Sequence, residues 1–465
     1  MFYKTIRCAD YKHIGAQLSS MFQRGIWLFI FACMPSLTYA QISFSAAIDL
    51  ALKNSPRVKM AEEDAQRTAV SLSALKSAYI PSITGSSGLG ASSGITLNVP
   101  TIFTVSSQSM VFNYSQRGYI RAGRLGVQAA DLSLHGIREQ IEEDTVVTYL
   151  SLDNAYQCRT AISSQYEYAL RLVAIVQERF EAGFENELEL KKARRTALQI
   201  KLQKSKMEDQ IATLTEHLRG LTGLTNESGI IVPASVPRDL LSSAMLLEPA
   251  PTCPDSPSTL SAEMDAHSKL ERASSDSKGT WMPQVTFEAQ YGRISPFNNV
   301  STYYNLNGNY NTLAAGVQFQ LPFLDLGRKA KAKESMVEAI RAQHQVESLR
   351  NQQREDCLQQ QHSYSQLTMR AELTELDQEI ATTQLKVALL QQEQGVVTDT
   401  SSPMTPKESQ NARIDERQRY LDMIEAIEQL HEQKVHLLRQ SGKLDEWVNS
   451  LVGHDNGNDQ ISNPR

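Results

Sequence analysis

The sequence predicts an internally duplicated chain of the α+β class, in which two-faced β-strands run directly into very long helices. Residues 313–323 alternate, with apolar side chains at the odd positions and small or polar ones between them. A period of two is typical of a strand with one apolar face. The polar run from Gly327 to Gln394 contains no proline, which predicts a helix roughly 100 Å long. The same succession of helix, strand and long helix occurs twice.

The composition argues against one large globular core and against a nucleic-acid partner. The chain has 465 residues, of which 41% are hydrophobic and only 7% aromatic. Lys and Arg number 46 against 52 Asp and Glu, so the basic face that phosphate binding requires is not expected. Beyond the leader, Cys158, Cys253 and Cys357 are odd in number and scattered, which predicts no disulfide framework.

Residues 1–40 have the features of a signal peptide. An apolar core at residues 25–34 follows Arg24, and Ala40 marks the expected cleavage site. This core is too short to span a bilayer as a helix. Met21 would by itself begin a signal peptide of ordinary length, and lipidation of Cys33 stays open as an alternative. Since no later segment has the length of a membrane helix, we expect either a periplasmic protein or an outer-membrane β-protein.

The first repeat, residues 41–225, is expected to hold two shorter helices, two strands and a long helical hairpin. Gly183 breaks the first long helix, and the short link at residues 182–186 predicts antiparallel neighbours. The expected elements are the helices Ser43–Asn54 and Arg57–Ala78, a strand after Pro81, the strand Ile102–Ser115, and the helices Arg117–Glu181 and Glu187–Leu221.

The return helix of this hairpin carries a heptad seam. Its residues alternate steps of four and three, which implies left-handed supercoiling against a neighbouring helix. One polar residue, Lys204, lies on the seam, where it either fixes helix register or faces water. The seam consists of Ala193, Ala197, Ile200, Lys204, Met207, Ile211, Leu214, Leu218 and Leu221.

A second repeat, residues 258–445, follows a linker or equatorial segment at residues 226–257. The triplet Trp281-Met282-Pro283 takes the place of Tyr79-Ile80-Pro81 before the first strand. After the helix that begins at Gly327, a last helix from about Lys407 to Ser441 returns, with a looser seam. Residues 446–465 are expected to form a polar tail.

The strands pose a physical problem that only assembly solves. In a bilayer, an open sheet edge leaves unpaired backbone groups in hydrocarbon, so a spanning sheet must close. Four strands per chain are too few to close a barrel with room inside. We therefore expect several copies to pool their strands into one barrel and their helical hairpins into one tube; a trimer would supply twelve strands.

The duplicated layout resembles the TolC-type outer-membrane efflux protein family. The order of the motifs, rather than any single one, carries the resemblance, which covers nearly all of the chain beyond the leader. The motifs are residues 47–56 (AIDLALKNSP), the triplets Tyr79-Ile80-Pro81 and Trp281-Met282-Pro283, residues 321–328 (LPFLDLGR), and residues 179–183 (RFEAG) followed by Glu189-Leu190 and Ala193.

The resemblance implies a homotrimer in the cell outer membrane that extends into the periplasm. Its twelve-stranded β-barrel would contact outer-membrane lipid and continue into a coiled-coil α-helical barrel. The implied function is an exit duct of a tripartite efflux or type I secretion system, which opens when partners engage the helical tips. Those partners would be a periplasmic adaptor (membrane fusion) protein and an inner-membrane pump of the RND, ABC or MFS type.

The resemblance also implies roles for residues at the hairpin tips. The candidates for adaptor docking are Arg179, Phe180, Gly183 and Gly395. The second tip departs from the motif, because Gly395 lacks the preceding arginine and two prolines follow it. An acidic ring at the periplasmic entrance has Glu181, Glu185, Glu187 and Asp399 as candidates; a solvated charged turn explains these acids equally well.

One apolar row separates the two function classes that the sequence allows. Val317, Phe319, Leu321 and Phe323 would face lipid in a barrel, whereas a periplasmic coiled-coil adaptor or scaffold protein would bury them. We expect no enzyme, cofactor or metal site. His431 and His436 are five residues apart and so point away from each other on a helix. The glycines of residues 85–94 lack the lysine of a phosphate loop, and no catalytic triad pattern is present.

Overall fold

The computed structural model describes residues 41–87, 101–224, 230–231, 254–294, 311–394 and 405–449. Several expectations fall outside these ranges. They are the signal peptide at residues 1–40 with Met21 and Cys33, most of the linker with Cys253, and the tip residues Gly395 and Asp399.

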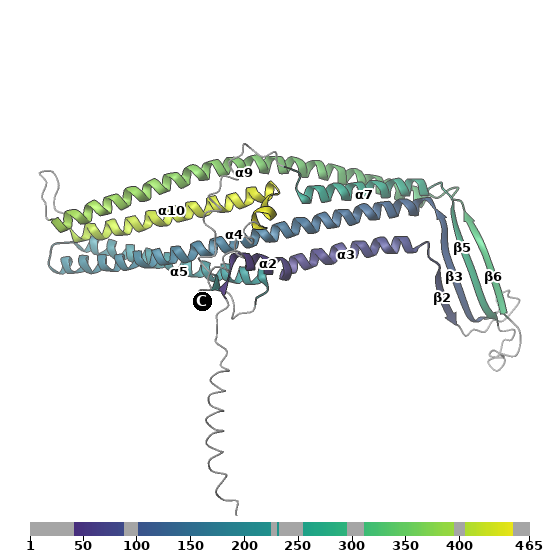
Figure 1. The fold of residues 1–465 in the computed structure, drawn as a ribbon, viewed down its shortest axis with the longest axis horizontal. Helices are drawn as coiled ribbons and strands as arrows, with labels where there is room; N and C mark the ends of the chain where they lie inside the picture. Colours follow the sequence, from purple (N-terminus) through teal and green to yellow (C-terminus); the bar gives the residue numbers. More distant parts are fainter. Residues whose placement is uncertain are drawn as a thin grey trace, which may run out of the picture.

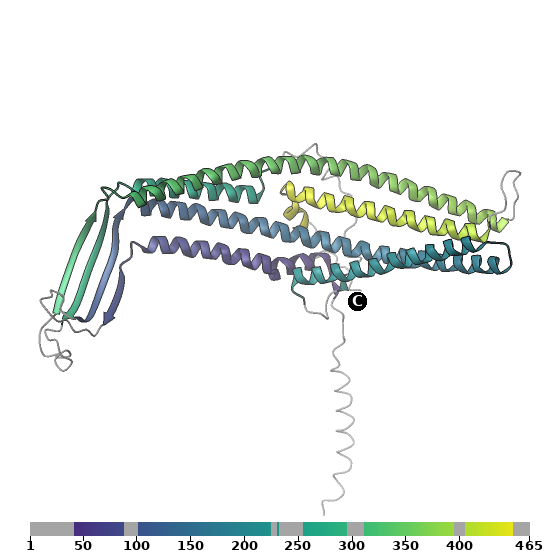
Figure 2. The same cartoon turned by 180° about the vertical axis from the view of Figure 1, so that it is seen from behind.

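The molecule is elongated, with its strands at one end and the helical hairpin tips at the other (Figure 1). The strands lie at an angle to the long helices, and the short elements near the N-terminus lie about midway along the rod. The same arrangement is visible from behind (Figure 2). The strand-to-helix junctions therefore join two differently oriented parts of the molecule.

The first repeat has the predicted elements, with boundaries shifted by a few residues. Asn113 caps the long helix through its side chain, which accepts from the Gln116 backbone N–H, so this helix begins three residues before Arg117. The elements are α2 (Phe44–Asn54), α3 (Pro56–Ser77), β2 (Ser82–Ser87), β3 (Thr101–Asn113), α4 (Tyr114–Glu181) and α5 (Glu187–Thr222).

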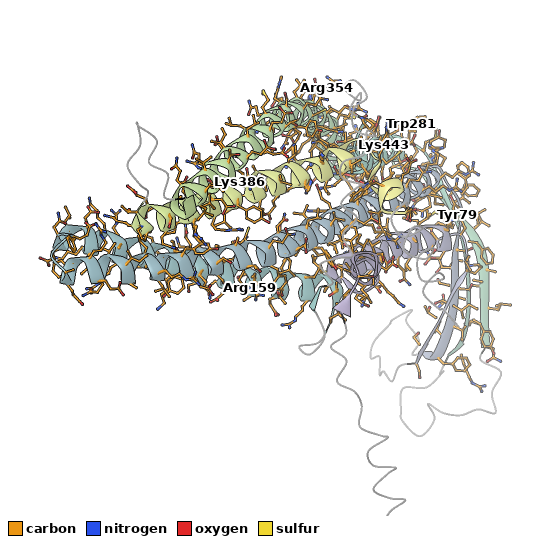
Figure 3. All side chains as sticks on the ribbon, turned by 60° about the vertical axis from the view of Figure 1, so that its left-hand side comes forward. Tyr79, Arg159, Trp281, Arg354, Lys386 and Lys443 are labelled. Carbon is orange, nitrogen blue, oxygen red and sulfur yellow. The ribbon has the colours of Figure 1, made fainter. Side chains whose placement is uncertain are left out.

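The second repeat repeats this order, which confirms the duplicated layout within the residues described. Pro406 begins the last helix, and Thr405 and Glu408 form a reciprocal capping box at its start. Tyr79 and Trp281 lie at corresponding places, each where a helix meets the sheet (Figure 3). The elements are α7 (Pro257–Gly279), β5 (Gln284–Ile294), β6 (Asn311–Gln320), α9 (Leu326–Gln394) and α10 (Pro406–Gln440).

The four strands form one antiparallel sheet in the order β2-β3-β5-β6. The two repeats meet in its centre, where β3 pairs with β5, and β2 and β6 are its edges. In the register of β5 and β6, Phe287 lies opposite Val317, and Val285 lies opposite Phe319. Directly opposite residues share a face of a sheet, so the apolar rows of the two strands form one surface.

The row predicted to face lipid is longer than the strand that carries it. β6 ends at Gln320, which pairs with Gln284, the first residue of β5. Leu321 therefore has no strand partner, and Pro322 has no N–H to donate to one. The prediction that Leu321 and Phe323 belong to the strand was wrong: both lie in the link to α9, where their side chains are exposed.

The helical hairpins are held by buried seams. The α5 seam is confirmed, because Ala193, Ala197, Ile200, Ile211 and other members are buried against α4 and α10. Lys204 is only half-buried, as expected for a polar residue at the side of a seam. Among the helices that the structure describes, none carries an apolar stretch long enough to span a lipid bilayer.

A separate core lies midway along the rod and corrects the expected tail boundary. The short strands β1 (Gln41–Ile42) and β4 (Ile230–Ile231) pair in parallel there. Phe44 and Tyr149 pack edge to face with ring centroids 5.3 Å apart, and Trp447 joins them. The predicted polar tail at residues 446–465 therefore begins too early, because Trp447 and Val448 are buried in this core.

The cysteines differ in state. Cys158 on α4 is a buried free thiol, whereas Cys357 on α9 is disulfide-bonded. The odd number and scattered spacing predicted no disulfide framework, and an individual disulfide such as that of Cys357 is compatible with this expectation.

Helices α4 and α7 approach closely through serines at heptad spacing. Ser261 and Ser268 donate to the carbonyls of Ala129 and Ala122, at 2.7 and 2.8 Å, and Ser115 donates to the Ser275 carbonyl at 2.9 Å. Serine is small and donates into the neighbouring backbone, so the two helices can lie nearer than with larger apolar residues. This contact positions the helix before β5 against the helix after β3.

We expect Gly118→Ala to loosen this contact. A Cβ at Gly118 would lie 1.7 Å from Ser275 Oγ and 2.9 Å from its Cβ, so a helix or side chain must shift. Such overpacking costs about 1–3 kcal/mol. The control is Gly126→Ala on the same helix, where the nearest atom would lie 3.7 Å away. Thermal unfolding followed by circular dichroism should show a lower midpoint for Gly118→Ala alone; equal midpoints would contradict the close approach.

Candidate functional site

The first hairpin tip is a tight turn between α4 and α5. The helix ends at Glu181, and Gly183 adopts a φ of 79°, a left-handed conformation that glycine accepts without steric cost. The backbone N–H groups of Phe184 and Glu185 donate to the Arg179 carbonyl at 2.8 and 3.3 Å. Arg179 and Gly183 thus belong to the turn itself, which explains why they recur in a tip motif.

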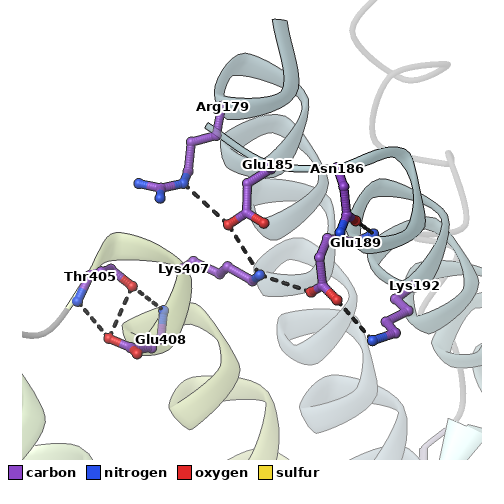
Figure 4. A network of polar contacts seen from close by, with 8 residues as sticks. All are labelled: Arg179, Glu185, Asn186, Glu189, Lys192, Thr405, Lys407 and Glu408. Carbon is purple, nitrogen blue, oxygen red and sulfur yellow. Dashed lines mark hydrogen bonds and ion pairs between the residues drawn. The ribbon is translucent and has the colours of Figure 1, made fainter. Parts of the chain in front are cut away.

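A polar network joins this tip to the start of α10 (Figure 4). Lys407 Nζ donates to Glu185 Oε1 at 3.2 Å and to Glu189 Oε2 at 2.9 Å. Arg179 Nε contacts the same Glu185 oxygen at 3.4 Å, and Lys192 donates to Glu189 at 2.8 Å. At the tip, the ammonium group of Lys407 therefore connects the two hairpins of one chain through two carboxylates of the first hairpin.

The titration of these groups follows from the contacts. Hydrogen bonds from Lys192 and Lys407 lower the pKa of Glu189 to about 2, and hydrogen bonds with Glu189 and Glu185 raise the pKa of Lys407. Glu189 and Lys407 therefore both remain charged across the physiological pH range, so the ion pair between them persists there. Sequence patterns do not reveal this network, because Lys407 is far from its partners along the chain.

The predicted acidic ring is partly compensated within the chain. Glu181 accepts from the Gln177 amide at 2.6 Å, and Glu187 lies 2.7 Å from Lys191. Glu185 contacts Arg179 and Lys407, as described above. Of the three ring candidates that the structure describes, Glu185 and Glu187 pair with cations, whereas Glu181 contacts a neutral amide. Their combined field is therefore weaker than that of three free carboxylates.

Apolar side chains are exposed at the same tip. Phe180 is 37% exposed, and sequence reasoning missed its neighbours Phe184 and Leu188, which are 76% and 58% exposed. All three lie in or beside the turn, on α4, the link and α5. An exposed apolar group next to a polar network is a common feature of protein docking surfaces.

The two faces of the sheet differ in chemistry. On one face, Thr84 and Ser106 hydrogen-bond to each other at 2.7 Å, and Gln318 lies opposite Thr286. The other face is apolar, although Ser107 and Ser109 interrupt it on β3. Its members are Ile83, Phe103, Val105, Phe112, Val285, Phe287, Ala289, Tyr291, Leu313, Ala315, Val317 and Phe319.

Comparisons with known proteins agree with this architecture. A family model described as outer membrane efflux protein matches residues 47–224. No curated protein matches the chain.

Solved structures with the same fold cover most of the chain. The CmeC outer membrane channel of Campylobacter jejuni is 16% identical with a TM-score of 0.68, covering 86% of both chains. The outer membrane protein VceC of Vibrio cholerae is 16% identical with a TM-score of 0.64, covering 86% of this chain and 96% of its own. The MtrE outer membrane channel of Neisseria gonorrhoeae is 12% identical with a TM-score of 0.61, covering 87% and 90%. The match to the outer membrane efflux protein model thus covers the first repeat, and the fold of these outer-membrane channels extends over both repeats.

Proposed function

We propose that the protein is the outer-membrane channel of a tripartite efflux or type I secretion system. It would act as a passive exit duct across the periplasm and the outer membrane. The observation that carries this proposal is a sheet with one apolar and one polar face, two open edges, and two long helical hairpins continuing from it. A sheet of this kind suits lipid on one side and water on the other only when its edges are closed.

A homotrimer would close the edges and cover a second unpartnered surface. On α9, a heptad seam is exposed in the single chain, while small residues of the same helix, such as Ala371 and Ala388, are buried. Such a seam requires a neighbouring helix, which another copy of the chain would provide. The seam residues alternate steps of four and three and are Met369, Leu373, Leu376, Ile380, Val387 and Leu390, with Thr383 completing the series.

Partners of the channel would dock at the hairpin tips. The exposed Phe180, Phe184 and Leu188 suit an apolar contact with a periplasmic adaptor protein, which would connect the channel to an inner-membrane pump of the RND, ABC or MFS type. Around a threefold axis, Glu181 and Glu187 would line the entrance as a weak acidic ring. A periplasmic adaptor or scaffold is the less favourable function, because it would have to bury Val317 and Phe319, which are 53% and 73% exposed.

Cell fractionation tests this function class. We expect the protein in the outer-membrane fraction, released only by detergent, and we expect the purified protein to form conducting pores in planar bilayers. Recovery of the mature protein in a soluble periplasmic extract without detergent would contradict the proposal.

Replacing Lys407 by methionine should open the periplasmic entrance. The change removes the ammonium group that joins α10 to Glu185 and Glu189, so the hairpins can separate at the tip. We expect a severalfold higher conductance in planar bilayers with little loss of thermal stability. The control is Lys192→Met, which removes a cation that pairs with Glu189 inside α5 and joins no second hairpin. Equal conductance of the two variants would show that Lys407 does not restrain the entrance.

A further inference from the structure

Three potential metal ligands meet where α4 passes the C-terminal segment. His135 and Glu139 are four residues apart on one face of α4, and Asp445 comes from the short helical segment at residues 444–449. The ligand atoms of the three side chains all lie within 4.8 Å of one another, and His135 Nδ1 is 3.2 Å from Glu139 Oε1. The chain thus brings an imidazole and two carboxylates from distant positions to one place.

A fourth side chain, Glu142, points into the same cluster from the next turn of α4. It is only 8% exposed, and its carboxyl group hydrogen-bonds with Asp445. Its Oε2 atom is buried without a hydrogen-bond partner among the residues that the structure describes. A buried carboxyl oxygen left without a donor is costly, so an unsatisfied polar atom lies beside the three potential ligands.

The cations near this cluster are engaged elsewhere, because Arg439 and His436 both contact Glu143.

We propose that His135, Glu139 and Asp445 bind a divalent transition-metal cation, with Zn²⁺ the best match. One imidazole nitrogen and two carboxylate oxygens form a three-ligand set that zinc accepts at about 2.0–2.2 Å, with a fourth position for water. Calcium and magnesium instead prefer oxygen ligands alone and more of them. His135 is half-exposed, which leaves a path from solvent into the site.

The bound cation would fasten the C-terminal segment to α4. Trp447 and Val448 follow Asp445 directly and pack in the core midway along the rod. A metal between Asp445 and the α4 ligands would add a polar connection to this apolar one. The site would therefore stabilise the middle of the channel, away from both the sheet and the tips.

Zn²⁺ titration of the full-length protein in detergent, after removal of metals with EDTA, tests the site. We expect saturable binding of one Zn²⁺ per chain by calorimetry and a higher thermal midpoint. His135→Ala, Glu139→Gln and Asp445→Asn should each weaken Zn²⁺ binding at least tenfold, while circular dichroism without metal verifies folding. The control is His344→Ala, which removes a histidine that lies 3.7 Å from one glutamate, Glu347, on the surface of α9.

Two results would overturn the inference. Equal Zn²⁺ affinity in the wild type and in folded His135→Ala and Asp445→Asn variants would exclude these ligands. Ca²⁺ binding as tight as Zn²⁺ binding would exclude a transition-metal site. Absence of saturable Zn²⁺ binding in the wild type would also reject it, and would indicate that Glu142 and Asp445 share a proton instead.

Discussion

Val317→Arg should prevent assembly in the outer membrane, whereas Gln318→Arg should leave it intact. The two residues are neighbours on β6, but Val317 lies opposite Phe287 on the apolar face and Gln318 opposite Thr286 on the polar face. Arginine facing lipid near the bilayer midplane costs about 2–4 kcal/mol per chain. In a trimer the cost recurs in every copy, while arginine on the polar face would stay in water.

The amount of heat-resistant oligomer in the outer-membrane fraction measures the difference between the two variants. We expect almost none for Val317→Arg and a nearly normal amount for Gln318→Arg, with a Phe319→Arg variant weakened less if it lies nearer the membrane boundary. The assigned faces would be wrong if Val317→Arg and Gln318→Arg had equal effects.

Glu143→Ala should destabilise the contact between α4 and α10 more than the replacement of other buried polar side chains does. The Glu143 carboxylate is almost fully buried and contacts both His436 and Arg439 of α10. Its removal takes this carboxylate from Arg439 and leaves His436 with Glu432. The expected loss is about 3 kcal/mol, the lower end for breaking a buried ion pair, because the two cations are about one-third exposed.

The same contact predicts a pH dependence. Hydrogen bonds with Glu143 and Glu432 raise the pKa of His436 to about 9, above the value of about 6.5 in the unfolded chain. Because folding raises the pKa of His436, its contribution to the free energy of unfolding is complete below about pH 6.5 and is lost as the pH rises through about 9. Thermal midpoints should therefore fall over this interval in the wild type and less in His436→Gln. A parallel fall in both proteins would contradict this role of His436.

The helices and strands could be predicted from the sequence where the local residue pattern agrees with the tertiary packing. The alternation around Val317 fixed the strand face because the same residues form the apolar surface with β5. The strand prediction failed at Leu321 and Phe323 because the alternation continues past the end of the partner strand. The sequence of one strand does not show where its partner ends. On α10, Leu421 is buried and its neighbour Tyr420 is partly buried against the same core, because this helix packs on both α9 and α4.

The polar sites were much less predictable. Arg179 and Gly183 were found through a local motif that the tight turn requires. Lys407 and Asp445 carry no local signal, since each meets its partners only when distant parts of the chain pack together. The acidic residues near the tip were visible in the sequence, but their compensation by Lys191 and Lys407 depends on helix spacing and on contact between the hairpins.

Cross-linking of β2 to β6 tests most directly whether several chains share one closed barrel. Within one chain these strands are the two edges of the sheet, about 14 Å apart, which is beyond the reach of a disulfide. Chains that carry Ile83→Cys together with a cysteine at Leu313, Ala315 or Val317 can therefore be joined only to one another. We predict covalent dimers and trimers on non-reducing gels for at least one pairing, and none for the single variants. Membrane-inserted protein that stays monomeric under oxidation with all three pairings would contradict the shared barrel.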